Sequence, residues 1–220
     1  MGAAGYETPK TTGRVSGAVG SIVMPDKVLL FDCETTGKAD FKRPASDPCQ
    51  PRLVQLAALL VEGEWELASL NCIIYPNGFT IPDDVASIHG ITTKRALDVG
   101  VTFLKVLSLF QDFAARADWF VGHNITFDQL VMQSEFYRAN IADPFQDKPS
   151  FCTMRNSTDI CCIPGQYGWK WPKLSEVYRY AFGENLEHAH NALHDLHATW
   201  RVYRWLKDKI AERDLSRLTS

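Results

Sequence analysis

The feature of this chain that most restricts its fold is an apolar run that ends in two carboxylates. Residues 27–32 read KVLLFD, and residues 33–37 continue as CETTG. A short apolar run bounded by turn-forming residues predicts a strand that is covered on both faces. Side chains two positions apart in an extended chain point to the same side. Asp32 and Glu34 are therefore expected to leave one face of a sheet close together.

This pair of carboxylates has two interpretations. It could be an acidic turn at the surface, or it could be half of a metal site, because close carboxylates repel each other unless a cation lies between them. The following Thr35, Thr36 and Gly37 favour the second interpretation. Small residues let the backbone approach a ligand, and their N–H groups can contact phosphate oxygens.

The pattern after this strand predicts an α/β domain. Strands are expected at 53–62, 66–75 and 119–122, the first two joined at Glu62-Gly63-Glu64, and helices at 82–89, from 93, and at 102–117, 127–139, 173–182 and 192–213. Residues 38–52 contain three prolines and predict a long loop, while 152–162 fits either helix or strand. Strands followed by helices predict a mixed sheet flanked by helices. The expected divisions are a flexible tail at 1–24, one domain at 25–214 and a short tail at 215–220.

Composition narrows the functional classes. The 220 residues carry a formal net charge of −3, so no overall positive field attracts nucleic acid, and such contacts must be local or bridged by metal ions. Six cysteines without CxxC spacing predict reduced thiols and not a zinc site. No apolar run reaches membrane-spanning length, and the first residues lack the features of a signal peptide. The chain is expected to be cytoplasmic.

A second group of polar residues follows the strand expected at 119–122. The segment 122–128 reads GHNITFD, which places Asp128 in the first turn of a helix beside a strand end. Asp128 could simply offset the helix dipole, and Asn124 could be an ordinary turn residue. Alternatively, both could belong to the site at Asp32 and Glu34.

A third group of polar residues lies at 190–195, which read HNALHD. Asp195 falls inside an apolar, helix-forming stretch, where an unpartnered acid is costly. His188, His194 and His197 could form a zinc cluster with one another, but solvated helix histidines are the favoured interpretation of these three. Basic residues further along could bind phosphate or form a solvated face, and the second is favoured: they are Arg201, Arg204, Lys207, Lys209, Arg213 and Arg217.

Together, Asp32, Glu34, Asp128 and Asp195, with His190 five residues before the last, match one specific pattern. The chain resembles the DEDDh branch of the proofreading exonuclease superfamily, which includes the epsilon subunit of bacterial DNA polymerase III. The resemblance runs from about Val28 to Trp205. It includes an HGIT segment at 89–92, and QPRLVQLA at 50–57 and WPKL at 171–174 further resemble stand-alone, often phage-associated bacterial members.

The resemblance implies a ribonuclease H-like fold, a mixed five-stranded sheet flanked by helices. It implies two Mg²⁺ or Mn²⁺ ions held by the four carboxylates, with His190 as the general base. It also implies that the terminal nucleotide is bound by Thr35, Thr36, Gly37, Asp84, His89, Asn124 and Phe127. Many members have an apolar residue after ETTG that wedges against the terminal base, whereas this chain has Lys38.

The function expected from the resemblance is 3′→5′ hydrolysis of nucleic acid with a free 3′ end, possible association with a polymerase, and no membrane. DNA is favoured over RNA as the substrate because of the ETTG turn. An exoribonuclease of the same branch and a non-catalytic nucleic-acid-binding or polymerase-accessory module are the alternatives. The presence of all five chemical residues disfavours the last.

Overall fold

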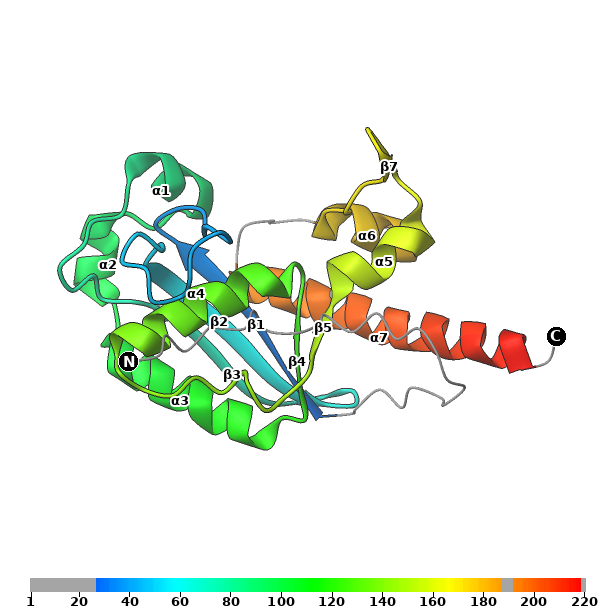
Figure 1. Cartoon of the computed structure of the whole chain (residues 1–220), viewed down its shortest axis with the longest axis horizontal. Coiled ribbons are helices and arrows are strands. Elements are labelled where there is room, and N and C mark those ends of the chain that lie inside the picture. The colour runs from blue at the N-terminus through cyan, green and yellow to red at the C-terminus, as the bar shows by residue number, and fades with distance from the viewer. Residues whose placement is uncertain (1–26, 187–191, 219–220) are drawn as a thin grey trace, which may run out of the picture.

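The computed structural model describes residues 27–186 and 192–218, so the tail expected at 1–24 lies outside the described residues. A five-stranded sheet has the order β3-β2-β1-β4-β5 (Figure 1). Its strands are β1 (Lys27–Thr35), β2 (Leu53–Glu62), β3 (Trp65–Ile73), β4 (Trp119–Gly122) and β5 (Ser150–Cys152). β1 pairs antiparallel with β2 and parallel with β4. The expected mixed five-stranded sheet is therefore confirmed.

Seven helices are described around this sheet. They are α1 (Asp83–His89), α2 (Thr93–Val99), α3 (Phe103–Arg116), α4 (Ile125–Arg138), α5 (Thr153–Cys161), α6 (Leu174–Phe182) and α7 (Ala192–Leu218). A small hairpin of β6 (Pro164–Gly165) and β7 (Gly168–Trp169) joins α5 to α6. No helix within 27–186 or 192–218 is long and apolar enough to cross a membrane.

The alternation of side chains along β1 builds a core on each face of the sheet. Leu29, Phe31 and Cys33 pack with residues of α3 and α4 on one face. Val28 and Leu30 point the other way, into a second core with residues of α7. β1 is thus covered on both faces, as the apolar run predicts, and this makes it the central strand that positions whatever follows its end.

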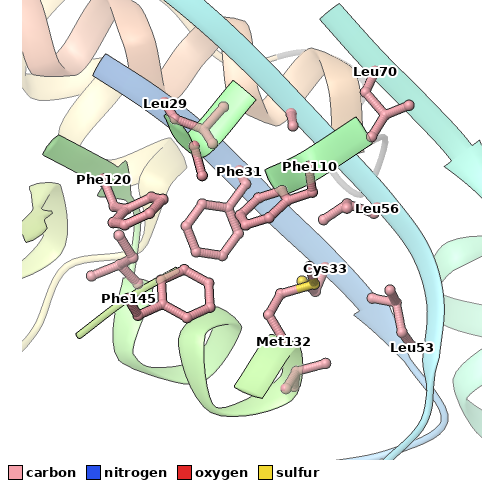
Figure 2. Packing of buried hydrophobic residues seen from close by; sticks show 14 of the residues in the cluster. Leu29, Phe31, Cys33, Leu53, Leu56, Leu70, Phe110, Phe120, Met132 and Phe145 are labelled. Carbon is pink, nitrogen blue, oxygen red and sulfur yellow. The ribbon is translucent and has the colours of Figure 1, made fainter. Parts of the chain in front are cut away.

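Aromatic rings fill much of the first core (Figure 2). Phe31 lies 5.1 Å from Phe110 and 5.6 Å from Phe145, measured between ring centroids, and Phe120 lies 4.8 Å from Phe145. These phenylalanines come from β1, α3, β4 and the segment before β5. Edge-on and tilted aromatic contacts add to the free energy gained by burial, so this cluster fixes α3 and the segment before β5 against the central strand.

Several boundaries differ from the sequence expectations. β1 continues to Thr35, so both carboxylates belong to the strand itself, and α4 begins at Ile125. The ambiguous segment 152–162 is the end of β5 followed by α5. The final helix reaches Leu218 and not residue 213. All six cysteines are free thiols.

Candidate active site

The carboxyl end of β1 carries the first two carboxylates. Asp32 and Glu34 pair across the sheet with Ala57 and Gln55 of β2, and the register shifts after Glu34. Both side chains lie on the same face of the sheet as Val28 and Leu30, which is the face that α7 covers. The expectation that the pair leaves one face of the sheet is therefore confirmed.

Asp128 reaches the same end of β1 from the first turn of α4. Its carboxylate is buried, and Oδ1 accepts a hydrogen bond of 3.0 Å from the N–H of Cys33, the residue between Asp32 and Glu34. The preceding Asn124 adopts a left-handed backbone with φ of 68° and makes no side-chain cap. Asparagine tolerates this conformation better than most residues, and it lets α4 begin directly after β4.

Asp195 lies in the first turn of α7, which covers the face of the sheet opposite to the one that α4 covers. The pKa of Asp32 is raised to about 7, first by burial and then by the negative charge of Asp195. Burial, followed by Asp32 and Asp195, raises the pKa of Glu34 to about 8. The pKa of Asp128 is also raised, by burial and then by Asp32. The structure thus brings together four carboxylates from three elements that are distant in sequence.

The chemistry of this group fits hard divalent cations. Such ions prefer oxygen ligands, and a bound cation would offset the repulsion that raises these pKa values. Within the described part of the chain, no three acidic, histidine or cysteine side chains stand around a single metal-sized point.

The ETTG turn is tied to the start of β2. The N–H of Thr36 donates to the carbonyl of Arg52 at 3.0 Å, and the N–H of Arg52 donates to Oγ1 of Thr36 at 2.9 Å. Thr35 donates its hydroxyl to the carbonyl of Gly37 at 2.6 Å. A Cβ on Gly37 would meet no atom within 4 Å, so the turn has room for a ligand.

The HGIT segment reaches this turn from α1. The Nδ1 of His89 accepts the N–H of Ile91 at 3.1 Å. Burial lowers the pKa of His89, while the neighbouring backbone of Thr35 acts in the opposite direction. His89 therefore lies beside the ETTG turn. Asp84 is exposed in the first turn of α1, and its carbonyl accepts the hydroxyl of Ser87.

Where they are described, the remaining candidate side chains are half-buried or exposed. Phe127 is half-buried against the first core, and Lys38 is exposed just beyond the turn. His190 lies outside the described residues, as does His188. His194 and His197 lie on the exposed side of α7, where Nε2 of His197 is 3.9 Å from a carboxylate oxygen of Glu66.

Sequence reasoning missed a buried ion-pair cluster behind the ETTG turn. Glu135 of α4 is 1% exposed, and its Oε1 accepts hydrogen bonds from Arg52 Nε at 2.9 Å, from the N–H of Leu53 at 2.9 Å and from Arg138 at 3.0 Å. Arg138 also donates to the carbonyl of Gln50 at 2.6 Å. The cluster holds the long loop and the ETTG turn against α4. Its only sequence signal was an acid two helical turns after Asp128.

His123 is a second residue that the sequence did not single out. Its Nε2 lies 3.0 Å from the carbonyl of Pro172, and its Nδ1 lies 2.9 Å from the hydroxyl of Thr153. A carbonyl only accepts, so Nε2 carries the proton. Burial lowers the pKa of His123 to about 4, and the ring is therefore neutral near pH 7. It joins the turn before α4 to the segment before α6.

Comparisons with known proteins agree with this arrangement. Subunit epsilon of DNA polymerase III from Aquifex aeolicus is 27% identical over an alignment of 193 positions, which covers 83% of this chain and 84% of that protein. The PolC-type DNA polymerase III of Streptococcus suis is 28% identical over 199 residues, 90% of this chain, but the chain spans only 12% of that protein.

A crystal structure of Escherichia coli exonuclease I in complex with a dA16 oligonucleotide superposes with a TM-score of 0.67 at 20% identity, over 88% of this chain and 43% of that one. At this identity the likeness shows a shared fold. The family model RNase T, described as an exonuclease, matches residues 29–203. That match includes all four carboxylates, and the chain belongs to the RNase T exonuclease family.

Proposed function

We propose that the domain is a divalent-metal-dependent 3′→5′ exodeoxyribonuclease that releases nucleoside 5′-monophosphates from single-stranded or frayed DNA ends. The observation that carries this proposal is the meeting of Asp32, Glu34, Asp128 and Asp195 at one end of β1, where burial and then neighbouring carboxylates raise the pKa values of the first three. Such a cluster does not stabilise the folded protein by itself, because each deprotonated carboxylate repels the others.

The proposed roles are those that the resemblance to the DEDDh exonucleases implies for these residues. The four carboxylates would hold two Mg²⁺ or Mn²⁺ ions, which would supply stabilisation of the charge on the attacking and leaving oxygens. His190 would accept the proton of the attacking water, a task that suits an imidazole near neutral pH. Thr35, Thr36 and Gly37, together with His89, would bind the terminal nucleotide, and Asn124, Phe127 and Asp84 would complete its pocket.

The choice of DNA is supported by the names of the relatives. Both similar polymerase proteins are DNA polymerase III components, and the superposed exonuclease I structure holds a deoxyadenosine oligonucleotide. Association with a polymerase and a cytoplasmic location are proposed on the same basis. Because the chain spans only part of the PolC-type protein and of exonuclease I, their other activities are not extended to it.

The test is digestion of matched DNA and RNA oligomers side by side with Mg²⁺. We expect mononucleotides from DNA at a rate well above that from RNA. Faster release from RNA would make the domain an exoribonuclease of the same family. Binding of both oligomers without any release, at saturating Mg²⁺ or Mn²⁺, would identify a non-catalytic module.

A further inference from the structure

An exposed group of aromatic side chains lies between α5 and α6, and we call residues 163–172 the aromatic arm. Its strands β6 and β7 pair Pro164 with Trp169 and Gly165 with Gly168. Tyr167 at the tip is 92% exposed, Trp169 is 52% exposed and Trp171 is 61% exposed. Exposed aromatic residues concentrated on one segment indicate an interaction surface.

The base of the arm is fixed close to the proposed active site. The carbonyl of Pro172 accepts the Nε2 proton of His123 at 3.0 Å, and His123 lies in the turn from β4 into α4, the helix that carries Asp128. On the other side, Lys170 pairs with Glu176 of α6 at 2.5 Å, and its N–H donates to the carbonyl of Ile163. The arm therefore projects from a base that is anchored to the turn before α4 and to the first turn of α6.

Trp171 also forms part of the wall of a basic hollow of about 650 Å³ between α5 and the second half of α7. The guanidinium of Arg155 lies 5.7 Å from the Trp171 ring centroid, and its Nε is buried without a hydrogen-bond partner among the described residues. Lys209 and Arg213 also line the hollow and add positive charge. Part of this charge is offset, because Asp159 lines the same hollow and Glu212 pairs with Lys209 at 2.7 Å.

Only part of the basic face of α7 belongs to this hollow. Arg201 and Arg204 do not line it, and they pair instead with Glu184 at 2.7 Å and with Glu64. Lys209 lies about four helical turns after Asp195, or about 21 Å along the axis at 1.5 Å per residue. A stacked strand at about 3.4 Å per nucleotide covers this distance in about six nucleotides, and a stretched strand does so in fewer.

We propose that the aromatic arm and the basic hollow bind single-stranded nucleic acid upstream of the 3′-terminal nucleotide. Bases stack on Trp171 and Trp169, and Arg155, Lys209 and Arg213 contact phosphates. Aromatic stacking tolerates any sequence, and positive side chains follow the backbone. Paired bases in a duplex do not offer free faces to the arm, so this surface selects single strands. The inference rests on the proposed function and deepens it.

The experiment measures affinity for fluorescein-labelled dT3 and dT15 in the presence of chelator, where no cleavage occurs. Trp171→Ala should weaken dT15 binding about tenfold, the usual scale for one lost stacking contact, and leave dT3 binding unchanged. Trp171→Phe should restore most of the affinity. Trp65→Ala is the matched control, because Trp65 is 76% exposed on β3, outside the arm and the hollow. It should change neither affinity.

A second measurement tests the phosphate contacts. For single strands, log affinity falls with log salt by about 0.7 per phosphate neutralised, so Lys209→Gln combined with Arg213→Gln should reduce that slope for dT15 by about 1.4. Tyr167→Ala, at the exposed tip, provides a variant that leaves the buried structure intact. It should weaken dT15 binding less than Trp171→Ala does.

The outcomes separate this inference from the proposed function. Unchanged dT15 affinity in Trp171→Ala and in the double variant would overturn the inference, and it would be the result for an arm that serves a protein partner. Equal losses for dT3 and dT15 would also overturn it. A wild-type protein that shows length-dependent binding but releases no nucleotide with Mg²⁺ would sink the proposed function alone.

Discussion

Single residues at the end of β1 make a contribution to stability that decreases as pH rises, opposite in sign to that of His123, whose pKa is lowered to about 4. The pKa values of Asp32, about 7, and Glu34, about 8, lie above those of ordinary carboxyl groups. Between about pH 4 and pH 8 the folded protein therefore holds protons that the unfolded chain has released, and stability falls as pH rises through this window.

The first prediction is thus a lower melting temperature at pH 8 than at pH 5 in the presence of chelator. Asp32→Asn removes one of the repelling charges and should melt higher than wild type at pH 8, with a smaller difference at pH 5. Thermal unfolding at both pH values provides the check. A wild-type protein that becomes more stable between pH 5 and pH 8 would contradict the assignment of raised pKa values to this cluster.

The second prediction separates the histidines near Asp195. His190→Ala should slow cleavage by about 10²- to 10⁴-fold, the usual contribution of a general base, and should remove the rising limb of the pH–rate profile. Metal affinity should survive because the carboxylates remain. His194→Ala and His197→Ala are matched controls on the exposed side of α7, and both should keep that limb. Loss of the limb in His194→Ala would show that the base is misassigned.

At the scale of secondary-structure elements, α4 both carries Asp128 and anchors the ETTG turn. The third prediction is that Glu135→Ala lowers the free energy of unfolding by about 3–5 kcal/mol, because it leaves Arg52 and Arg138 without their buried partner. Glu62→Ala is the control, since it removes a half-exposed pair with Lys27, and should cost less than about 1 kcal/mol. Similar losses in chemical denaturation of the two variants would contradict an anchoring role for Glu135.

Helices and strands with a strong hydrophobic pattern were predictable from the sequence, and very short strands were not. The apolar run of β1 and the periodicity of α3 predicted both elements to within a few residues. β5 has only three residues and β6 and β7 have two each, too few to show a period. β5 depends on pairing with the distant strand β4, and β6 and β7 pair only with each other.

The same limit applies to the site. Asp32 and Glu34 could be grouped from local spacing, because an extended strand places alternate residues on one side. The contact from Glu135 to Leu53 spans 82 residues, and that from His123 to Pro172 spans 49. Neither contact leaves a trace in local sequence. Asp128 and Asp195 were identified through the resemblance, and no local pattern joins them to β1.

For the molecule as a whole, the net charge of −3 is compatible with a nuclease whose positive charge is supplied locally. Bound cations at the four carboxylates and the basic hollow between α5 and α7 would each give the negatively charged strand a place to bind. Attraction confined to such places responds strongly to salt and to chelation. The overall fold is that of the exonuclease family, with Asp32, Glu34 and Asp128 held by buried strand and helix ends.

The central claim is that a 3′ end is bound and cleaved at these carboxylates. The most direct measurement compares two 5′-labelled DNA oligomers, one with a free 3′ hydroxyl and one with a 3′ phosphate, over a time course with Mg²⁺. We predict stepwise shortening of the free-ended oligomer, resistance of the blocked one, and no cleavage of either by Asp128→Asn. Early release of the 5′ label as a mononucleotide, or undiminished cleavage by Asp128→Asn, would contradict the account.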